Sequence, residues 1–174
     1  MFVLGGARSG KSRYAQEYVA GLELPVAYLA TATACDDEMT ARIKRHQQDR
    51  PARWRTVEEP LDAAQKVQEC GERGEAVLLE CLTLLVSNHL IKPDVTDEQG
   101  GADALAEVDR VLVAARASQT PTVLVSNEVG MGLHPMSPLG RLFQDIAGWA
   151  NQRVAAAADE VYFLVAGIPL KVKG

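Results

Sequence analysis

The sequence predicts an α/β fold of three layers, in which helices cover both faces of a mostly parallel sheet and an antiparallel hairpin forms one edge. Apolar runs too short for helices alternate with longer amphipathic stretches, as in a repeating strand–helix pattern. The early runs are continuously apolar, which is typical of parallel strands buried on both faces. Two short runs close together, 161–165 and 170–172, predict the hairpin across residues 167–169.

The expected elements follow one another along the whole chain. Strands are expected at 2–4, 25–30, 54–57, 76–80, 122–126, 161–165 and 170–172, and helices at 13–20, 36–49, 61–72, 82–90, 102–117 and 139–158. Acidic residues open the second helix, and glycines follow the third, as the ends of helices favour. The stretch 91–101 is rich in turn formers and is expected to be a loop, a candidate lid. No repeat or linker interrupts residues 1–174, so we expect a single domain.

Composition narrows the classes of function. The 174 residues are 47% hydrophobic and carry a net charge of −5, which disfavours nucleic-acid binding. Three cysteines without C-x-x-C spacing support neither a disulfide framework nor a zinc site, and this favours the cytoplasm. No apolar run approaches the ~20 residues of a membrane span. We expect no secretory leader, because a phosphate-binding motif begins at Gly5.

That motif is the strongest functional signal. Residues 5–12 read GGARSGKS and match G-x-x-x-x-G-K-[ST], between an expected strand and an expected helix. Backbone N–H groups of such a loop surround phosphate oxygens, and the following helix directs its positive end at the same anion. Lys11 is expected to reach the β- and γ-phosphates, and the Ser12 hydroxyl to ligate Mg²⁺. A nucleoside triphosphate is therefore predicted to bind Gly5, Gly6, Ala7, Arg8, Ser9, Gly10, Lys11 and Ser12.

Other polar residues come at the ends of buried strands, where open α/β sheets bind their ligands. Glu80 ends the apolar strand 76–80 in the Walker B pattern, with Glu where Asp is more usual, and is expected to serve Mg²⁺. Residues 31–33 (TAT) and 127–128 (NE) follow two further strands.

A local concentration of cations lies between Arg42 and Arg55, in a chain that is acidic as a whole. A solvated helix face is one interpretation, and phosphate recognition by guanidinium groups is the other. His46 lies within this cluster. A histidine in such a position more often packs against its neighbours than takes part in catalysis. The neighbouring cations, however, disfavour the imidazolium and would leave a neutral nitrogen able to attack phosphorus.

Together these stretches resemble the bifunctional adenosylcobinamide kinase / adenosylcobinamide-phosphate guanylyltransferase family of cobalamin biosynthesis. The stretches are GGARSGKSRYAQ (5–16), YLATA (28–32), DDEMTARIKRHQQDRPARWRTVEE (36–59), LLECLT (78–83), VSNEVGMG (125–132) and RLFQDIAGWANQRVAAAADEVYFLVAGIPLKVK (141–173). The block RI-x-x-H-x-x-x-RP-x-x-W-x-T is more specific than the phosphate loop, and it makes His46 our first choice of nucleophile.

The resemblance implies two reactions at one nucleotide site. ATP or GTP would phosphorylate adenosylcobinamide; His46 would then accept GMP from GTP and pass it to adenosylcobinamide phosphate, giving adenosylcobinamide-GDP. It also implies that the nucleotide site includes Thr31, Ala32, Thr33, Gln47, Gln48, Asp49, Arg50, Glu58 and Glu80 besides the phosphate loop. Helix initiation is an alternative role for Glu58. The family further resembles the recombinase-like branch of P-loop NTPase folds and includes trimers, which implies a homo-oligomer.

Two rival interpretations remain at this stage. A plain P-loop small-molecule kinase would have the same loop and sheet, with a structural His46. A nucleotide-dependent switch or motor related to recombinases would act with a partner or DNA, but the acidic balance of the chain disfavours it.

Overall fold

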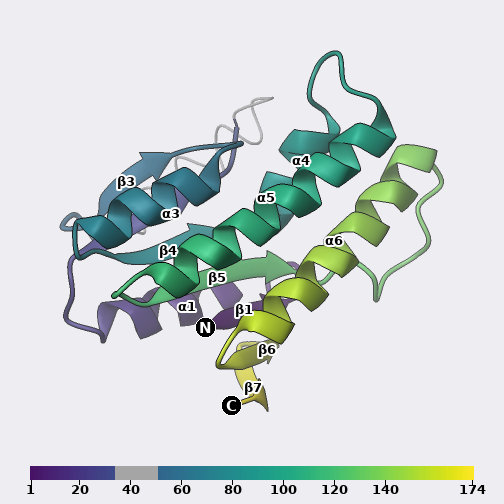
Figure 1. Cartoon of the computed structure of the whole chain (residues 1–174). Coiled ribbons are helices and arrows are strands. Elements are labelled where there is room, and N and C mark those ends of the chain that lie inside the picture. Colours follow the sequence, from purple (N-terminus) through teal and green to yellow (C-terminus); the bar gives the residue numbers. More distant parts are fainter. Residues whose placement is uncertain (34–50) are drawn as a thin grey trace.

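A seven-stranded sheet organises the chain, in the order β3-β2-β4-β5-β1-β6-β7 (Figure 1). The computed structural model describes residues 1–33 and 51–174. The strands are β1 (Phe2–Gly5), β2 (Val26–Ala30), β3 (Arg55–Glu58), β4 (Ala76–Glu80), β5 (Thr122–Asn127), β6 (Val161–Val165) and β7 (Ile168–Lys173), and the helices are α1 (Lys11–Ala20), α3 (Ala63–Glu72), α4 (Leu82–Leu90), α5 (Asp97–Ala117) and α6 (Pro138–Ala157). Within these described residues, six neighbouring pairs make the sheet, and only β6–β7 is antiparallel. The predicted fold class is confirmed.

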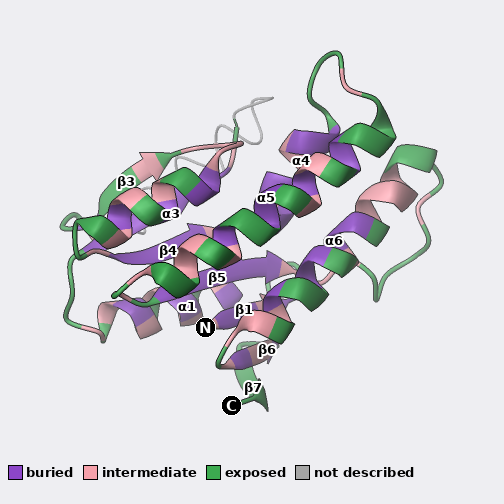
Figure 2. Ribbon diagram, viewed as in Figure 1, coloured by how far each residue is buried: buried purple, intermediate pink, exposed green. Residues whose placement is uncertain are grey.

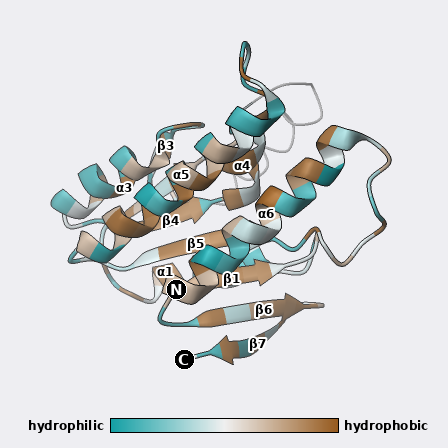
Figure 3. Cartoon of the chain, turned by 45° about the vertical axis from the view of Figure 1, so that its right-hand side comes forward, coloured by the Kyte–Doolittle hydropathy of each residue, from teal (hydrophilic) through white to brown (hydrophobic). Residues whose placement is uncertain are grey.

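Helices cover both faces of this sheet, and the central strands β2, β4 and β5 are buried along nearly their whole length (Figures 1 and 2). Val77 and Leu79 of β4 pack with residues of α3, α4, α5 and α6, whereas Leu78 packs with Ala15 and Val19 of α1 on the other face. Because both faces are covered, apolar side chains are needed at every position of the central strands. Figure 3 shows the central strands as largely hydrophobic.

The carboxyl ends of the parallel strands meet at one edge of the sheet. Glu58 of β3 and Glu80 of β4 both pair with Ala30 of β2, and Gly5 of β1 pairs with Asn127 of β5. The phosphate loop, residues 5–12, therefore leaves the sheet beside the ends of these strands. This is the edge at which the sequence predicts the site.

The stretch 91–101 is only partly a loop, so the predicted loop was too long. α5 begins at Asp97, five residues before the expected start, because the Thr96 side chain accepts a hydrogen bond from the N–H of Gln99 and acidic residues follow in the first turn. Gly100 lies against α4, where a Cβ would come within 2.8 Å of the His89 carbonyl oxygen. A Cβ at Gly101 would come within 3.0 Å of Ile146 of α6. The two glycines therefore serve packing between helices and do not mark a lid.

The hairpin turn lies at Ala166 and Gly167, one position earlier than the residues predicted for it. Both have positive φ, 51° and 83°, as two-residue hairpin turns require. β7 then begins at Ile168 and is exposed along its whole length.

Candidate nucleotide site

The phosphate loop is shaped by contacts with the tip of the β6–β7 hairpin. The N–H of Gly167 donates to the carbonyl oxygen of Ser9 at 2.8 Å. Gly10 has φ of 93°, and a Cβ there would come within 3.1 Å of the Gly167 Cα. Glycine is therefore needed at position 10 both for backbone conformation and for space.

Lys11 lies at the start of α1, with only 7% of its surface exposed. Its ammonium group donates to the carbonyl oxygen of Gly6 at 3.1 Å, so the side chain folds back over the loop. A cation held above a ring of backbone N–H groups is the arrangement that binds triphosphates in this type of loop.

Ser12 and Glu80 are brought together although 68 residues separate them. The Ser12 hydroxyl donates to one oxygen of the Glu80 carboxylate, and the Tyr28 hydroxyl donates to the other at 2.8 Å. Hydroxyl and carboxylate oxygens are the ligands that Mg²⁺ prefers, with phosphate oxygens and water completing the shell. The two residues predicted to ligate Mg²⁺ are thus in contact, and the tyrosine orients the carboxylate; their ligation of a metal stays a prediction. Within the described part of the chain, no group of three or more His, Cys, Asp or Glu could hold a metal ion.

Tyr28 was not among the predicted site residues. It lies two positions before Ala30 in β2, on the same face of the sheet, and Ala30 is paired with Glu80. Strand periodicity could have placed Tyr28 diagonally opposite Glu80 only if the register of β2 and β4 had been known.

Glu58 occupies the position equivalent to Glu80 on the opposite side of β2. Both residues pair with Ala30, so both carboxylates lie at the nucleotide edge, and Glu58 is exposed. It ends β3 and does not begin a helix, because α3 starts at Ala63. The helix-initiating alternative for Glu58 is wrong, and its role as a nucleotide contact stays a prediction.

Thr31 is completely buried, and its hydroxyl is used within the protein. This oxygen donates to the Cys81 carbonyl at 2.8 Å and accepts from the Cys81 N–H at 2.9 Å. Thr31 therefore joins the end of β2 to the residue after Glu80. Ala32 is partly buried and Thr33 exposed, so these two are the members of the predicted trio with surface available to a ligand.

Five predicted site residues lie outside the described residues: His46, Gln47, Gln48, Asp49 and Arg50. Of the cation cluster, Arg53 and Arg55 are described. Arg55 begins β3, at the opposite edge from the phosphate loop, and pairs with Glu75 at 2.5 Å. This hydrogen-bonded pairing raises the pKa of the guanidinium and lowers the pKa of the carboxyl. Arg55 is thus part of a structural ion pair rather than of the phosphate site.

Asn127 and Glu128 end β5 beside the phosphate loop, but their side chains bond within the protein. The Asn127 amide donates to the Thr83 hydroxyl at 3.0 Å, and the Glu128 carboxylate accepts from the Gly130 N–H at 2.6 Å. The N–H of Glu128 donates to the Gly5 carbonyl oxygen at 3.1 Å. These contacts fix the following loop, residues 129–137, to the phosphate loop.

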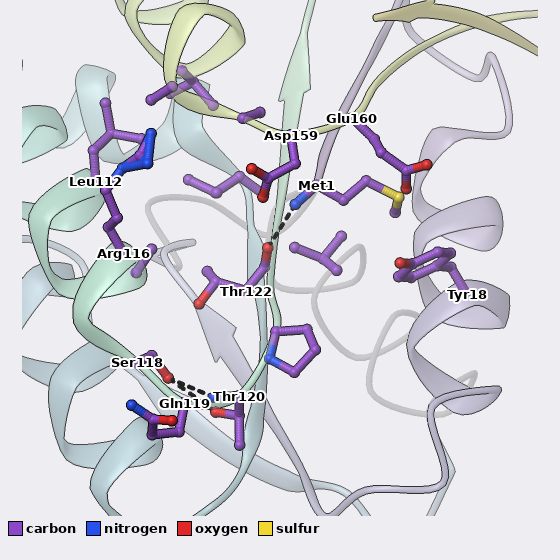
Figure 4. A pocket seen from close by; sticks show the side chains of 17 residues that line it. Met1, Tyr18, Leu112, Arg116, Ser118, Gln119, Thr120, Thr122, Asp159 and Glu160 are labelled. Atoms are coloured by element: carbon purple, nitrogen blue, oxygen red, sulfur yellow. Dashed lines mark hydrogen bonds between the residues drawn. The ribbon is translucent and has the colours of Figure 1, made fainter. Parts of the chain in front are cut away.

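A pocket of about 550 Å³ lies elsewhere, between the ends of α5 and α6 and the start of β1 (Figure 4). Its lining includes Met1, Arg116 and Glu160, and the Met1 amino group donates to the Thr122 carbonyl oxygen at 3.0 Å. Burial lowers the pKa of that amino group. The pocket is at the amino ends of the strands, away from Lys11 and Glu80, and does not belong to the nucleotide site.

Sequence comparison decides between the interpretations. A family model described as cobinamide kinase / cobinamide phosphate guanyltransferase matches residues 1–172. This chain belongs to that family. A bifunctional adenosylcobalamin biosynthesis protein CobU of Escherichia coli K12 is 45% identical, with 99% of both chains covered. A similar protein named CobP from Pseudomonas aeruginosa is 44% identical, covering 99% of this chain and 96% of the relative.

The cobinamide kinase / guanyltransferase family therefore accounts for nearly the full length of the chain. A solved structure described as a prototypical ATPase of a type III secretion system has a TM-score of 0.55 at 12% identity. The match covers 94% of this chain but 50% of the ATPase, and at this identity it supports the fold alone. It agrees with the P-loop architecture.

Proposed function

We propose that this chain phosphorylates adenosylcobinamide with ATP or GTP and then transfers GMP from GTP to adenosylcobinamide phosphate, giving adenosylcobinamide-GDP. The family model names both activities and spans residues 1–172, which favours this function over a plain kinase. The observation that carries the proposal is the Ser12–Glu80–Tyr28 cluster beside Lys11, the arrangement expected for a bound triphosphate and its metal.

Mg²⁺ fits the oxygen ligands present, and Ser12 and Glu80 would hold it. When bound, it neutralises charge on the phosphate oxygens. In the kinase step, the N–H groups of residues 5–12 and the Lys11 ammonium position the γ-phosphoryl group and stabilise its charge while the substrate hydroxyl attacks. Because phosphoryl transfer needs little covalent help from the protein, positioning and charge supply most of the catalysis.

In the second reaction, a nitrogen of His46 attacks the α-phosphorus of GTP. A P–N bond forms, the bond to the bridging oxygen breaks, and pyrophosphate leaves. A phosphate oxygen of adenosylcobinamide phosphate then attacks the same phosphorus, which releases the imidazole. Two displacements of this kind replace one difficult step.

Labelling with GTP tests this reaction. The wild type should retain label from α-labelled GTP but none from γ-labelled GTP, and the label should be acid-labile and absent in His46→Ala. If the wild type retains no α-label at any pH, the guanylyltransferase half of the proposal fails.

The loop 129–137 is the part of this edge suited to binding the substrate adenosylcobinamide, which is a corrinoid. Met131, Leu133 and Met136 are 80%, 96% and 95% exposed, and Glu128 ties the loop to the phosphate loop. Apolar side chains at a phosphate-binding edge match a large acceptor whose ring is apolar and whose hydroxyl must reach the γ-phosphate.

A homo-oligomer is part of the proposal, with a trimer as the expected form. Among the strands that the structure describes, β7 pairs with β6 alone and ends the sheet, and its Ile168, Leu170 and Val172 are 51–66% exposed. An exposed apolar edge strand favours pairing with another chain. Sedimentation of wild type and Leu170→Lys tests this surface; a wild-type monomer would contradict it.

A cytoplasmic location and small-molecule substrates complete the proposal, with no role for nucleic acid. Cys70 and Cys81 are buried free thiols, as a reducing compartment favours. No helix in the described ranges, 1–33 and 51–174, is long and apolar enough to cross a membrane.

A further inference from the structure

The loop 129–137, which joins β5 to α6, is attached to α6 at two places. The Gln144 side chain donates to the Val129 carbonyl oxygen at 3.0 Å. The Arg141 guanidinium donates to two carbonyl oxygens near the other end of the loop, at 3.1 and 2.9 Å. Residues 130–134 are therefore held beside the helix between these two attachments.

A pocket of about 340 Å³ lies between this loop and α6. Its lining includes His134 of the loop and Gln144, Asp145, Gly148, Trp149 and Gln152 of α6. Trp149 is 51% exposed, and among the described residues no hydrogen bond is made by the side chains of His134, Asp145 and Gln152. A large aromatic surface and several polar groups are therefore open to a ligand at one place.

Gly148 lies in the middle of α6, where glycine destabilises a helix relative to alanine. Packing does not explain this glycine, because nothing described lies within 4 Å of a Cβ added there. The two glycines of α5 differ, since a Cβ at Gly100 or Gly101 would meet a neighbouring helix. A helical glycine that faces open space beside an exposed tryptophan suits a place where a ligand comes close to the backbone.

The pocket lies beside the phosphate loop. The N–H of Glu128 donates to the Gly5 carbonyl oxygen at 3.1 Å, and the Glu128 carboxylate accepts from the N–H of Gly130, which lines the pocket. A molecule larger than the pocket therefore has the phosphate loop within its reach.

The acceptor in the proposed function has the chemistry that this pocket would recognise. The corrin ring of adenosylcobinamide is broad and largely apolar, and carboxamide side chains surround it. An indole packs favourably against such a ring, and carboxamide, carboxylate and imidazole groups form hydrogen bonds with amides. Because Trp149 and Gln152 lie three positions apart on α6, the ring contact and the amide contact come from one face of the helix.

We propose that the pocket between the loop 129–137 and α6 binds the corrin ring of the acceptor, with Trp149 packed against the ring and Gln152 bonded to its carboxamides. The inference rests on the proposed function, because it takes adenosylcobinamide as the substrate. Trp149 determines the affinity for the acceptor and does not touch the nucleotide, so histidine labelling by GTP should not depend on it.

Equilibrium dialysis of the complete chain against adenosylcobinamide tests the site without any nucleotide, since the corrinoid is coloured and its bound and free amounts can be measured by absorbance. Trp149→Ala should raise the Kd about 10- to 100-fold, the range for loss of an aromatic stacking surface. Gly148→Ala should raise the Kd at least about threefold while raising the Tm by about 1–4 °C, because alanine favours the helix but fills space that the ligand needs. Weaker binding by a more stable protein is not explained by misfolding. In kinase assays, the KM for adenosylcobinamide should rise in both variants with little change in kcat.

Val113→Ala is the control, because Val113 of α5 is another exposed apolar side chain (72%) and lies away from this pocket. It should leave the Kd unchanged, and all three variants should be labelled from α-labelled GTP at the wild-type rate. An unchanged Kd in Trp149→Ala would overturn the proposal, as would a parallel loss of GTP labelling, which would indicate a general structural defect.

Cobinamide without the adenosyl group separates the two parts of the ligand. Trp149→Ala should weaken its binding as much as it weakens the binding of adenosylcobinamide. A loss confined to adenosylcobinamide would overturn the proposal, because the tryptophan would then contact the adenosyl group and not the corrin ring. A wild type that binds no adenosylcobinamide would instead refute the proposed function.

Discussion

Tyr28→Phe tests whether the orientation of the Glu80 carboxylate matters for catalysis. The substitution removes one hydroxyl from a residue that is 2% exposed and leaves the ring packing unchanged. Glu80 keeps the bond from Ser12 but loses the 2.8 Å bond from Tyr28. A hydrogen bond to a charged group contributes roughly 1.5–3 kcal/mol. At about 1.4 kcal/mol per factor of ten, the metal-dependent rate should fall roughly 10- to 150-fold.

The assay measures kinase and guanylylation rates over a series of Mg²⁺ concentrations. We expect both rates to fall and the Mg²⁺ concentration for half-maximal activity to rise, because the same carboxylate serves both reactions. Tyr18→Phe is the control: this partly buried tyrosine of α1 lines the pocket at the other end of the sheet. Wild-type rates and Mg²⁺ dependence in Tyr28→Phe would refute the reasoning.

Three further predictions follow from individual contacts. Lys11→Ala should reduce both activities by at least about a hundredfold in single-turnover assays, because one cation serves one triphosphate site; guanylylation that survives would require a second site. Gly10→Ala should lower the free energy of unfolding by about 1–2 kcal/mol in thermal or urea denaturation without nucleotide, because φ is 93° and Gly167 is in contact. Gly6→Ala is the control, because nothing lies within 4 Å of the added Cβ, and it should leave the free energy of unfolding unchanged. Equal losses of stability in the two variants would contradict this account. Burial raises the pKa of the Glu107 carboxyl above its ordinary 4.5, so the folded state binds the proton more tightly. Relative to Glu107→Gln, the wild type should therefore lose stability as pH rises from about 4.5 through the raised pKa. A difference in unfolding free energy between the two proteins that does not change with pH would refute this prediction.

Local sequence patterns predicted most of the sheet, because its strands are short, apolar and buried on both faces. The 76–80 run ends in Glu80 with the bounds expected, and the phosphate loop joins β1 to α1 as its motif requires. The start of α5 was misplaced because two glycines were interpreted as a loop. Gly100 lies against α4 and Gly101 against Ile146 of α6, and such packing between helices is not visible in a local pattern.

Residues that support the site were harder to predict than residues that form it. Ser12 and Glu80 belong to motifs, so their types and spacing identify them. Tyr28 acts through the register of β2 with β4, which no local pattern specifies. Arg55 shows the opposite error. The sequence grouped it with the neighbouring cations as a possible phosphate contact, but the structure pairs it with Glu75.

The bond from Gly167 to Ser9 links the beginning of the chain to its far end. During synthesis on a ribosome, the segment that will receive the triphosphate emerges long before the turn that supports it. We therefore expect the loop to bind nucleotide only after β6 and the following turn have joined β1, because this bond and the contact of Gly10 with Gly167 support its shape. A C-terminal deletion that removes this turn should abolish nucleotide binding even though every residue of the motif remains.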